Sequence, residues 1–258
     1  MRHFVAAVLL LFLFPVLSPG VMADSLPDVI DKIRGSIVGV GTVYPPRQPN
    51  IKGPPSSLMA TGFVVGNGLQ IITNAHVIPK KLDADNNQTL AVFSGRGKAI
   101  KAHPARVVKI DKEHDLALLA IQGSPLPALV LGDSAGVREG QEIAFTGFPI
   151  GAVLGLYPVT HRGIVSVIVP MARPANTSRT LTATQLKHMR NPFMVFQLDA
   201  TAYPGNSGSP VYESATGKVI GVLNSVFVKE SRESILTRPS GISYAIPSAY
   251  VHSLLDTR

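Results

Sequence analysis

The stretch at residues 202–210 limits most strongly how this chain can fold and what it can do. It reads Ala-Tyr-Pro-Gly-Asn-Ser-Gly-Ser-Pro, with Ser207 between two glycines and prolines just outside them. Glycine adopts backbone angles that other residues avoid, while proline stiffens the flanks and removes backbone donors. Such a loop can present the Ser207 hydroxyl outward beside free N–H groups, as acyl transfer requires. A tight turn between two strands is the alternative interpretation.

A serine hydroxyl is a weak nucleophile at neutral pH, so it needs a base, and the base needs an acid that orients it. His76 lies near the end of an apolar run, residues 71–78, that is typical of a buried strand. Asp115 stands directly before a second apolar run, residues 116–121. The chain order His76, Asp115, Ser207 is that of the chymotrypsin-type triad. We therefore predict these three as the catalytic residues.

Other titratable side chains offer alternatives. His114 adjoins Asp115, but alternation along a strand would put the two side chains on opposite faces, so His76 is the predicted base. Asp111 and Asp133 are rival acids. Asp133 lies in a turn-like Gly-Asp-Ser, and Asp115, at the head of an apolar run, is preferred. All the histidines other than His76 are expected to be structural or exposed, and they stand at positions 3, 103, 114, 161, 188 and 252.

Further blocks occur in an order that one protease family shares. Residues 61–65 and 73–77 read Thr-Gly-Phe-Val-Val and Thr-Asn-Ala-His-Val, and residues 115–119 read Asp-Leu-Ala-Leu-Leu. Other blocks are Leu-Gly-Asp-Ser at 131–134, Gly-Phe-Pro-Ile-Gly at 147–151, Arg-Gly-Ile-Val-Ser at 162–166, Gln-Leu-Asp-Ala at 197–200 and Gly-Ile-Ser-Tyr-Ala-Ile-Pro-Ser at 241–248. Together they resemble the chymotrypsin-fold serine proteases, in particular the bacterial HtrA/DegP-like branch.

The resemblance implies an all-β fold of two six-stranded antiparallel β-barrels, with the active site in the cleft between them. The first barrel is expected at about residues 36–125 and the second at about 131–248, within one protease domain at 24–258. Short helices are expected at both ends. The spacing of apolar residues in 24–34 itself predicts an amphipathic helix there, and residues 249–258 fit a closing helix.

The resemblance also implies how the residues share the chemistry. His76 accepts the proton of Ser207, and Asp115 fixes the histidine tautomer. The oxyanion hole is predicted at Gly205, Asn206 and Ser207, with the N–H groups of Gly205 and Ser207 as the main donors. The reaction needs no cofactor and no metal ion.

The substrate pocket is predicted at Thr201, Leu223, Asn224 and Ser225. Thr201 stands where trypsin-like enzymes that cut after Arg or Lys carry an acid. Leu223 stands where the glutamate-specific bacterial relatives carry a histidine. A neutral, mostly apolar pocket indicates small or medium aliphatic side chains at the cleaved position.

The first 23 residues have the pattern of a secretory signal peptide. A short positive start at Arg2 precedes an apolar stretch, and Val-Met-Ala ends at residue 23, so the mature chain would begin at Asp24. An uncleaved membrane anchor is the alternative, but the stretch is short for a span and Pro15 interrupts it. The chain has no cysteine, which excludes thiol catalysis and favours a bacterial periplasmic or secreted enzyme.

The net charge of +8 comes from 24 Lys and Arg against 16 Asp and Glu, and the basic residues are dispersed. With no tryptophan and no recognisable nucleic-acid module, we expect polypeptide substrates and no nucleic acid. A basic insertion at 171–191 is either a sensing loop or a solvated surface loop. No stable membrane insertion is expected once the leader is removed, and the resemblance allows a homo-oligomer.

Two features depart from related patterns. Arg34 before Ile37 resembles a zymogen cleavage site, but Asn206 replaces the aspartate that would pair with the freed amino group, so no such activation is expected. HtrA-like proteins usually carry PDZ domains after the protease domain, and this sequence ends at Arg258 without one. Two other functions stay open: a binding or chaperone-like protein of low activity, and an esterase or exfoliative-type hydrolase of narrow specificity.

Overall fold

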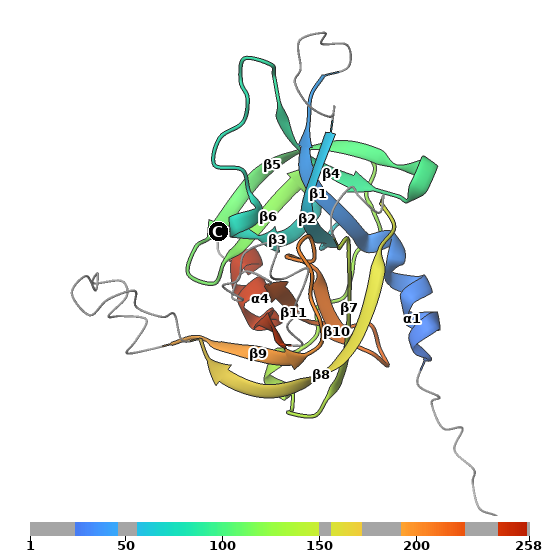
Figure 1. Cartoon of the computed structure of the whole chain (residues 1–258), viewed down its shortest axis with the longest axis vertical. Helices are drawn as coiled ribbons and strands as arrows, with labels where there is room; N and C mark the ends of the chain where they lie inside the picture. Colours follow the sequence, from blue (N-terminus) through green and yellow to red (C-terminus); the bar gives the residue numbers. More distant parts are fainter. Residues whose placement is uncertain (1–23, 46–55, 150–155, 172–191, 225–241, 257–258) are drawn as a thin grey trace, which may run out of the picture.

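The computed structural model describes residues 24–45, 56–149, 156–171, 192–224 and 242–256, and within them the strands close into two antiparallel barrels (Figure 1). The first barrel has the strand order β1-β2-β3-β6-β5-β4 and the second the order β10-β11-β12-β9-β8-β7. The expected all-β fold of two six-stranded barrels is confirmed.

Alternating or fully apolar runs form the strands of the first barrel, as their composition predicts. Its strands are β1 (Ile37–Val43), β2 (Ser56–Val65), β3 (Gln70–Asn74), β4 (Thr89–Ser94), β5 (Lys101–Asp111) and β6 (Leu116–Ile121). Each strand pairs antiparallel with its neighbours, and β1 pairs with both β2 and β4 to close the barrel. The Asn67-Gly68 pair, a frequent hairpin signal, lies in the turn between β2 and β3, where Gly68 has φ +84°.

The second barrel repeats the design in the other half of the chain. Its strands are β7 (Glu142–Gly147), β8 (Val159–Pro170), β9 (Met194–Asp199), β10 (Pro210–Glu213), β11 (Val219–Asn224) and β12 (Ile242–Pro247). Register shifts leave one extra residue in β8, at Ser166, and one in β11, at Ile220, as β-bulges do.

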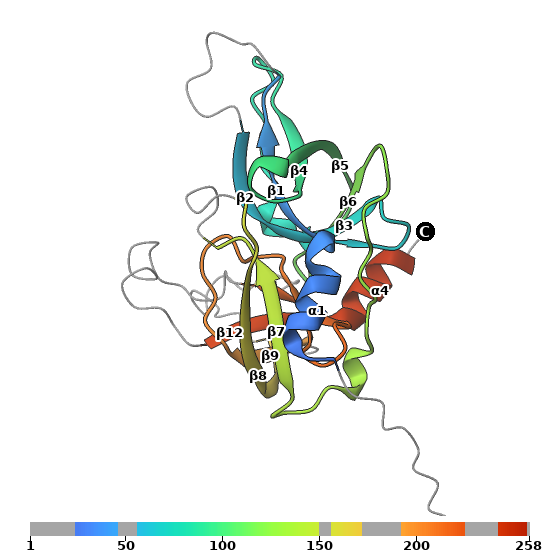
Figure 2. The same ribbon diagram turned by 90° about the vertical axis from the view of Figure 1, so that its right-hand side faces the viewer.

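In the described residues, two α-helices flank the barrels, α1 (Leu26–Ile33) and α4 (Ser248–Asp256). Ser25 and Asp28 form a capping box that starts α1, and Val29 and Ile33 bury its apolar face. Both helices lie at the level where the barrels meet (Figure 2). The expected terminal helices are therefore present. Single-turn 3₁₀ segments are η1 (Arg34–Ser36), η2 (Ala75–Val77), η3 (Gly97–Ala99) and η4 (Ser134–Gly136).

The buried apolar residues form three clusters. One lies inside each barrel. The third joins the barrels, because it includes Phe63 of β2, Tyr212 of β10, Val29 of α1 and Val251 of α4. Burial of this shared cluster is the main force that fixes one barrel against the other.

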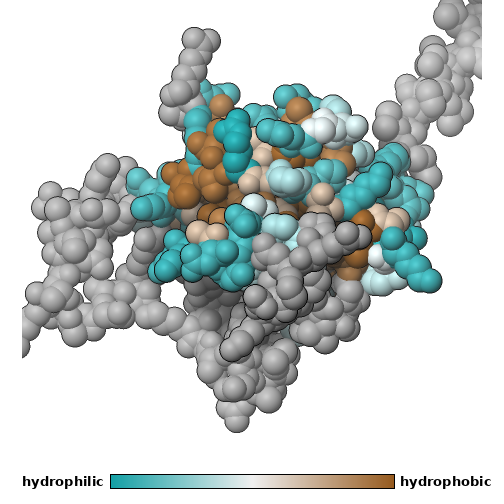
Figure 3. Space-filling model, turned by 90° about the horizontal axis from the view of Figure 1, so that it is seen from above, coloured by the Kyte–Doolittle hydropathy of each residue, from teal (hydrophilic) through white to brown (hydrophobic). Residues whose placement is uncertain are grey.

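The outside of the first barrel carries apolar side chains among polar ones. On β5, Val107, Val108 and Ile110 are exposed where a register shift interrupts pairing with β6. Seen from above, apolar patches alternate with polar side chains (Figure 3). Scattered exposed apolar residues are normal on protein surfaces, so they do not by themselves define an interface.

Two sequence expectations fall outside the described residues: the signal peptide at 1–23 and almost all of the basic insertion at 171–191. Among the helices that the structure describes, none is long and apolar enough to cross a membrane. The barrel and domain boundaries given above stay predictions.

Candidate active site

The predicted catalytic residues come from both barrels. His76 lies in η2, directly after β3, and Asp115 lies in the turn between β5 and β6. Ser207 lies in the loop between β9 and β10. A hydrogen bond from the backbone N–H of Thr61 on β2 to the carbonyl oxygen of Ser207, at 3.0 Å, joins the two halves at this point.

His76 and Asp115 form a two-point contact. Nδ1 of His76 lies 2.7 Å from Oδ2 of Asp115, and the backbone N–H of His76 donates to Oδ1 at 2.9 Å. A carboxylate only accepts hydrogen bonds, so a neutral His76 carries its proton on Nδ1 and leaves Nε2 as an acceptor. The Asp115 and His76 side chains are 17% and 29% exposed, so the pair is shielded from water yet reachable.

The backbone of Asp115 is held as firmly as its side chain. Its carbonyl oxygen accepts from the backbone N–H of Ala75 at 3.0 Å and from Nδ2 of Asn74 at 3.1 Å. Asp115 has φ +55°, a left-handed conformation that is uncommon outside glycine. Strand alternation does not continue through this residue, and the turn is shaped by these bonds.

Asn224 also contacts the aspartate. Its Nδ2 donates to Oδ2 of Asp115 at 2.7 Å, and Asn224 is 1% exposed. The sequence predicted Asn224 in a substrate-pocket wall. The structure instead turns its amide onto Asp115, where it supplies a donor from the second barrel to the carboxylate of the first.

The loop around Ser207 is pressed against the first barrel. Gly208 has φ +85°, and a Cβ there would lie 2.1 Å from the carbonyl oxygen of Thr61. Only glycine fits such an approach. The N–H of Gly208 donates to the carbonyl of Leu223, and Leu223 in turn donates to Ser209, both at 2.9 Å. The loop is therefore clamped between β2 and β11.

The residues predicted to form the oxyanion hole have different hydrogen-bond partners within the protein. The N–H of Asn206 donates to the carbonyl of Tyr203 at 3.0 Å, which corrects the expectation that it joins Gly205 and Ser207 as a donor. Gly205 has φ +98°, and its carbonyl accepts from Oγ1 of Thr61 at 2.8 Å. The Asn206 side chain is fully buried, and within the described ranges neither of its amide atoms has a partner.

The other predicted pocket residues differ in their burial. Leu223 is fully buried within the core cluster of the second barrel, so its side chain is part of that core rather than an open wall. Thr201 is half-buried at the start of the Ser207 loop. Ser225 lies outside the described residues.

The rival acids have other partners. Oδ1 of Asp133 accepts from the N–H of Ala135 at 2.8 Å and caps η4. Asp111 bonds to His114 through Oδ2 and Nδ1 at 2.6 Å. His114 and Asp115 bond to different partners, but both lie in the turn between β5 and β6, so the strand alternation expected for them does not apply. Sequence reasoning missed the His114–Asp111 pair, whose signal was an Asp three residues before a His at a turn.

His161 is a half-buried histidine on β8. Its ring stacks on Phe145 at 4.7 Å between centroids and lies 5.9 Å from Tyr203. Burial lowers the pKa of His161 below its ordinary value of 6.5. Its Nε2 is buried without a partner among the residues that the structure describes. The expectation of a structural role fits this packing.

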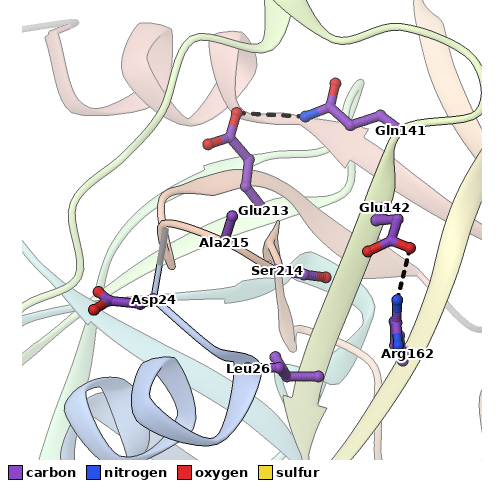
Figure 4. A pocket seen from close by; sticks show the side chains of 8 residues that line it. All are labelled: Asp24, Leu26, Gln141, Glu142, Arg162, Glu213, Ser214 and Ala215. Atoms are coloured by element: carbon purple, nitrogen blue, oxygen red, sulfur yellow. Dashed lines mark hydrogen bonds and ion pairs between the residues drawn. The ribbon is translucent and has the colours of Figure 1, made fainter. Parts of the chain in front are cut away.

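A surface pocket of about 420 Å³ lies elsewhere (Figure 4). Its lining consists of Asp24, Leu26, Gln141, Glu142, Arg162, Glu213, Ser214 and Ala215. Its carboxylates have partners already: Glu142 pairs with Arg162 at 2.6 Å, and Glu213 accepts from Gln141 at 3.4 Å. None of the predicted site residues lines it. In the described part of the chain, no group of three or more His, Asp and Glu residues is placed to hold a metal ion.

Residues 60–222 match the family model described as a trypsin-like peptidase domain, which covers more than half of the chain. The chain therefore belongs to the trypsin-like peptidase family. Within that class, its relatives are of the HtrA/DegP type, as the sequence blocks predicted.

Curated relatives include a probable periplasmic serine endoprotease DegP-like from Halomonas elongata, 30% identical over 224 residues that cover 87% of this chain and 40% of that protein. Human serine protease HTRA3 is 30% identical over 232 residues, 90% of this chain and 44% of that protein. The chain thus spans less than half the length of these two relatives.

Solved structures agree on the fold. The HtrA-type protease AlgW with a decapeptide has a TM-score of 0.62 at 23% identity, over 90% of this chain and 66% of that one. The crystal structure of Deg5 has a TM-score of 0.60 at 25% identity, over 88% of this chain and 90% of that one.

Proposed function

We propose that this chain is an exported serine endopeptidase in which Ser207, His76 and Asp115 form the catalytic triad. The observation that carries the proposal is the contact between Nδ1 of His76 and Oδ2 of Asp115 at 2.7 Å, opposite a glycine-flanked serine loop of the other barrel. Membership of the trypsin-like peptidase family supports it.

In the proposed mechanism, Nε2 of His76 takes the proton of Ser207 as its Oγ attacks the peptide carbonyl carbon. Asp115 stabilises the imidazolium, which then gives its proton to the leaving amine. Water repeats the sequence on the acyl-enzyme and frees Ser207. The N–H groups of Gly205 and Ser207 are the proposed donors to the oxyanion.

The proposed substrates are polypeptides, including unfolded ones, which suits a role in protein quality control. Cleavage is proposed after small or medium aliphatic residues, because Thr201 supplies no charge and Leu223 no imidazole. A peptide-library profile should show Ala, Val or similar residues before the cut, and a profile dominated by Arg, Lys or Glu would contradict this.

Export is proposed from the leader at 1–23, and a periplasmic DegP-like protein among the relatives supports it. We propose the bacterial periplasm or the medium as the location, with no stable membrane insertion of the mature chain. Assembly into a homo-oligomer is compatible with the proposal.

The test uses the mature chain from Asp24, incubated with a fluorophosphonate probe and with casein, beside Ser207→Ala as control. We expect labelling and cleavage in the wild type and a loss of about 10⁶-fold in turnover in the variant. Labelling without casein cleavage would favour the narrow-specificity hydrolase. No labelling of folded protein would favour the binding protein.

A further inference from the structure

His114 stands at the centre of a cluster beside the proposed triad. Its Nδ1 bonds to Oδ2 of Asp111 at 2.6 Å, and its backbone N–H donates to Oδ1 of Asp111 at 3.0 Å. Its ring stacks on Tyr250 of α4, with centroids 4.0 Å apart and planes 19° apart. The edge of Phe193, just before β9, packs at 4.9 Å. Three segments of the chain therefore meet at one imidazole: the β5–β6 turn, the residue before β9, and α4.

This cluster lies one peptide bond from Asp115, whose φ of +55° is uncommon for a side chain of its kind. Such a conformation persists only where its surroundings fix it. Hydrogen bonds from Asn74, Ala75 and His76 of the β3–η2 segment hold Asp115 in this conformation. The residue before Asp115 is His114, whose hydrogen bonds to Asp111 lie within the same turn.

The β5–β6 hairpin contacts α4 at a second point. Nζ of Lys109 donates to the carbonyl oxygen of Leu254 at 3.2 Å, in the last turn of α4. The helix is itself anchored, because Val251 and Leu254 are buried in the cluster that joins the barrels. The hairpin that carries Asp115 is thus attached to a fixed element outside the barrel.

We propose that His114 is a positioning residue for Asp115. Through its bond to Asp111 and its stack on Tyr250, it holds the β5–β6 turn against α4, so that the Asp115 carboxylate stays where it orients His76. The inference rests on the proposed triad and extends it, since it makes the C-terminal helix a support of the active site. An imidazole suits this position because one ring can both stack on Tyr250 and donate a hydrogen bond to Asp111.

Steady-state kinetics of the mature chain test this. His114→Ala should lower kcat about 10- to 100-fold with KM within about twofold, because a displaced aspartate misplaces the base but leaves substrate binding intact. Tyr250→Ala should act in the same direction, and Tyr250→Phe should retain activity because it keeps the ring. The matched control is His252→Ala, which removes an exposed histidine of α4, the helix that carries Tyr250.

A double-mutant cycle separates positioning from general structure. In an Asp115→Ala background, His114→Ala should cause no further loss of kcat, because its target is already gone. An equal loss in both backgrounds, an unchanged kcat in His114→Ala, or a Tyr250→Phe variant as weak as Tyr250→Ala would overturn the proposal. If His114→Ala does not fold, His114→Phe and Asp111→Asn replace it in the same cycle.

A proton NMR measurement does not depend on turnover. The Nδ1 proton of His76 in its short bond should give a far-downfield resonance, identified by its loss in His76→Gln. We expect that resonance to broaden or vanish in His114→Ala and to persist in His252→Ala. If it persists unchanged in His114→Ala, the positioning role is wrong even when the triad is right. A wild type that is inert to the fluorophosphonate probe would count against the triad instead.

Discussion

At the scale of single residues, Asp115 is distinguished by how many donors converge on it. Its carboxylate accepts from His76 twice and from Asn224, and its carbonyl accepts from Asn74 and Ala75. Several hydrogen bonds to a carboxylate fix its direction. The proposed triad is therefore supported by side chains of both barrels.

Asn224→Ala should lower kcat about tenfold, because Oδ2 of Asp115 loses one of its two side-chain donors, and a hydrogen bond to a charged group contributes about 1.5–3 kcal/mol. Measurement of kcat and KM on a peptide substrate checks this, with thermal unfolding to confirm the fold. Asn224→Asp should lose more, since it brings a second carboxylate to the site. Full activity in Asn224→Ala would show that the contact has no part in catalysis.

How far single residues were predictable depended on the kind of signal. His76, Asp115 and Ser207 each carry a local pattern, and their placement follows from those patterns. The contact of Asn224 with Asp115 joins the end of β11 to a turn of the other barrel, so no local pattern could reveal it. The same holds for Tyr250 under His114.

At the scale of elements, the loop that carries Ser207 depends on how closely it approaches β2. Both Thr61 and Thr73 lie within 2.4 Å of the position where a Cβ at Gly208 would stand. Thr61 also binds the carbonyl of Gly205 through Oγ1, which accepts in turn from the N–H of Phe148 at 2.9 Å. The loop conformation is set by the strand that it faces.

Gly208→Ala should therefore displace the loop. The atom nearest to the added methyl group is the backbone carbonyl oxygen of Thr61, which cannot move aside as a flexible side chain can, and φ +85° disfavours alanine by about 1–2 kcal/mol. We expect a lower melting temperature and loss of fluorophosphonate labelling. Gly136→Ala in η4 is the control, because a Cβ there meets nothing within 4 Å. Equal labelling of both variants would contradict the expected close approach.

Elements were predictable where apolar periodicity was strong and turns were marked, as between β2 and β3. The closure of each barrel was not readable from periodicity, because β1 pairs with β4 across 40 and more residues. That part of the prediction came from the family resemblance.

At the scale of the whole molecule, stability should depend on pH through two half-buried histidines, His103 and His161. Burial lowers the pKa of His161, and burial together with Lys101 lowers that of His103. As pH falls below about 6.5, the unfolded chain binds protons that the folded chain excludes. The free energy of unfolding should therefore decrease with falling pH until the lowered pKa values are passed.

Replacing His161 by Phe should flatten this acid dependence, because the stack on Phe145 is kept and the titrating group removed. Melting temperatures at pH 7.5 and pH 5 measure the effect, with exposed His252→Phe as the control. If the melting temperature falls as much between pH 7.5 and pH 5 in His161→Phe as in the wild type, other groups dominate the acid dependence.

Thr61 binds the Ser207 loop through its N–H and its hydroxyl, and its carbonyl accepts from Thr73 at 2.7 Å. The proposed catalytic site is therefore complete only while the two halves of the chain are docked. Produced as separate fragments, neither half would hold a reactive serine. Reactivity toward the probe should return upon mixing and rise with fragment concentration, so that chemical competence would report directly on the association of the halves.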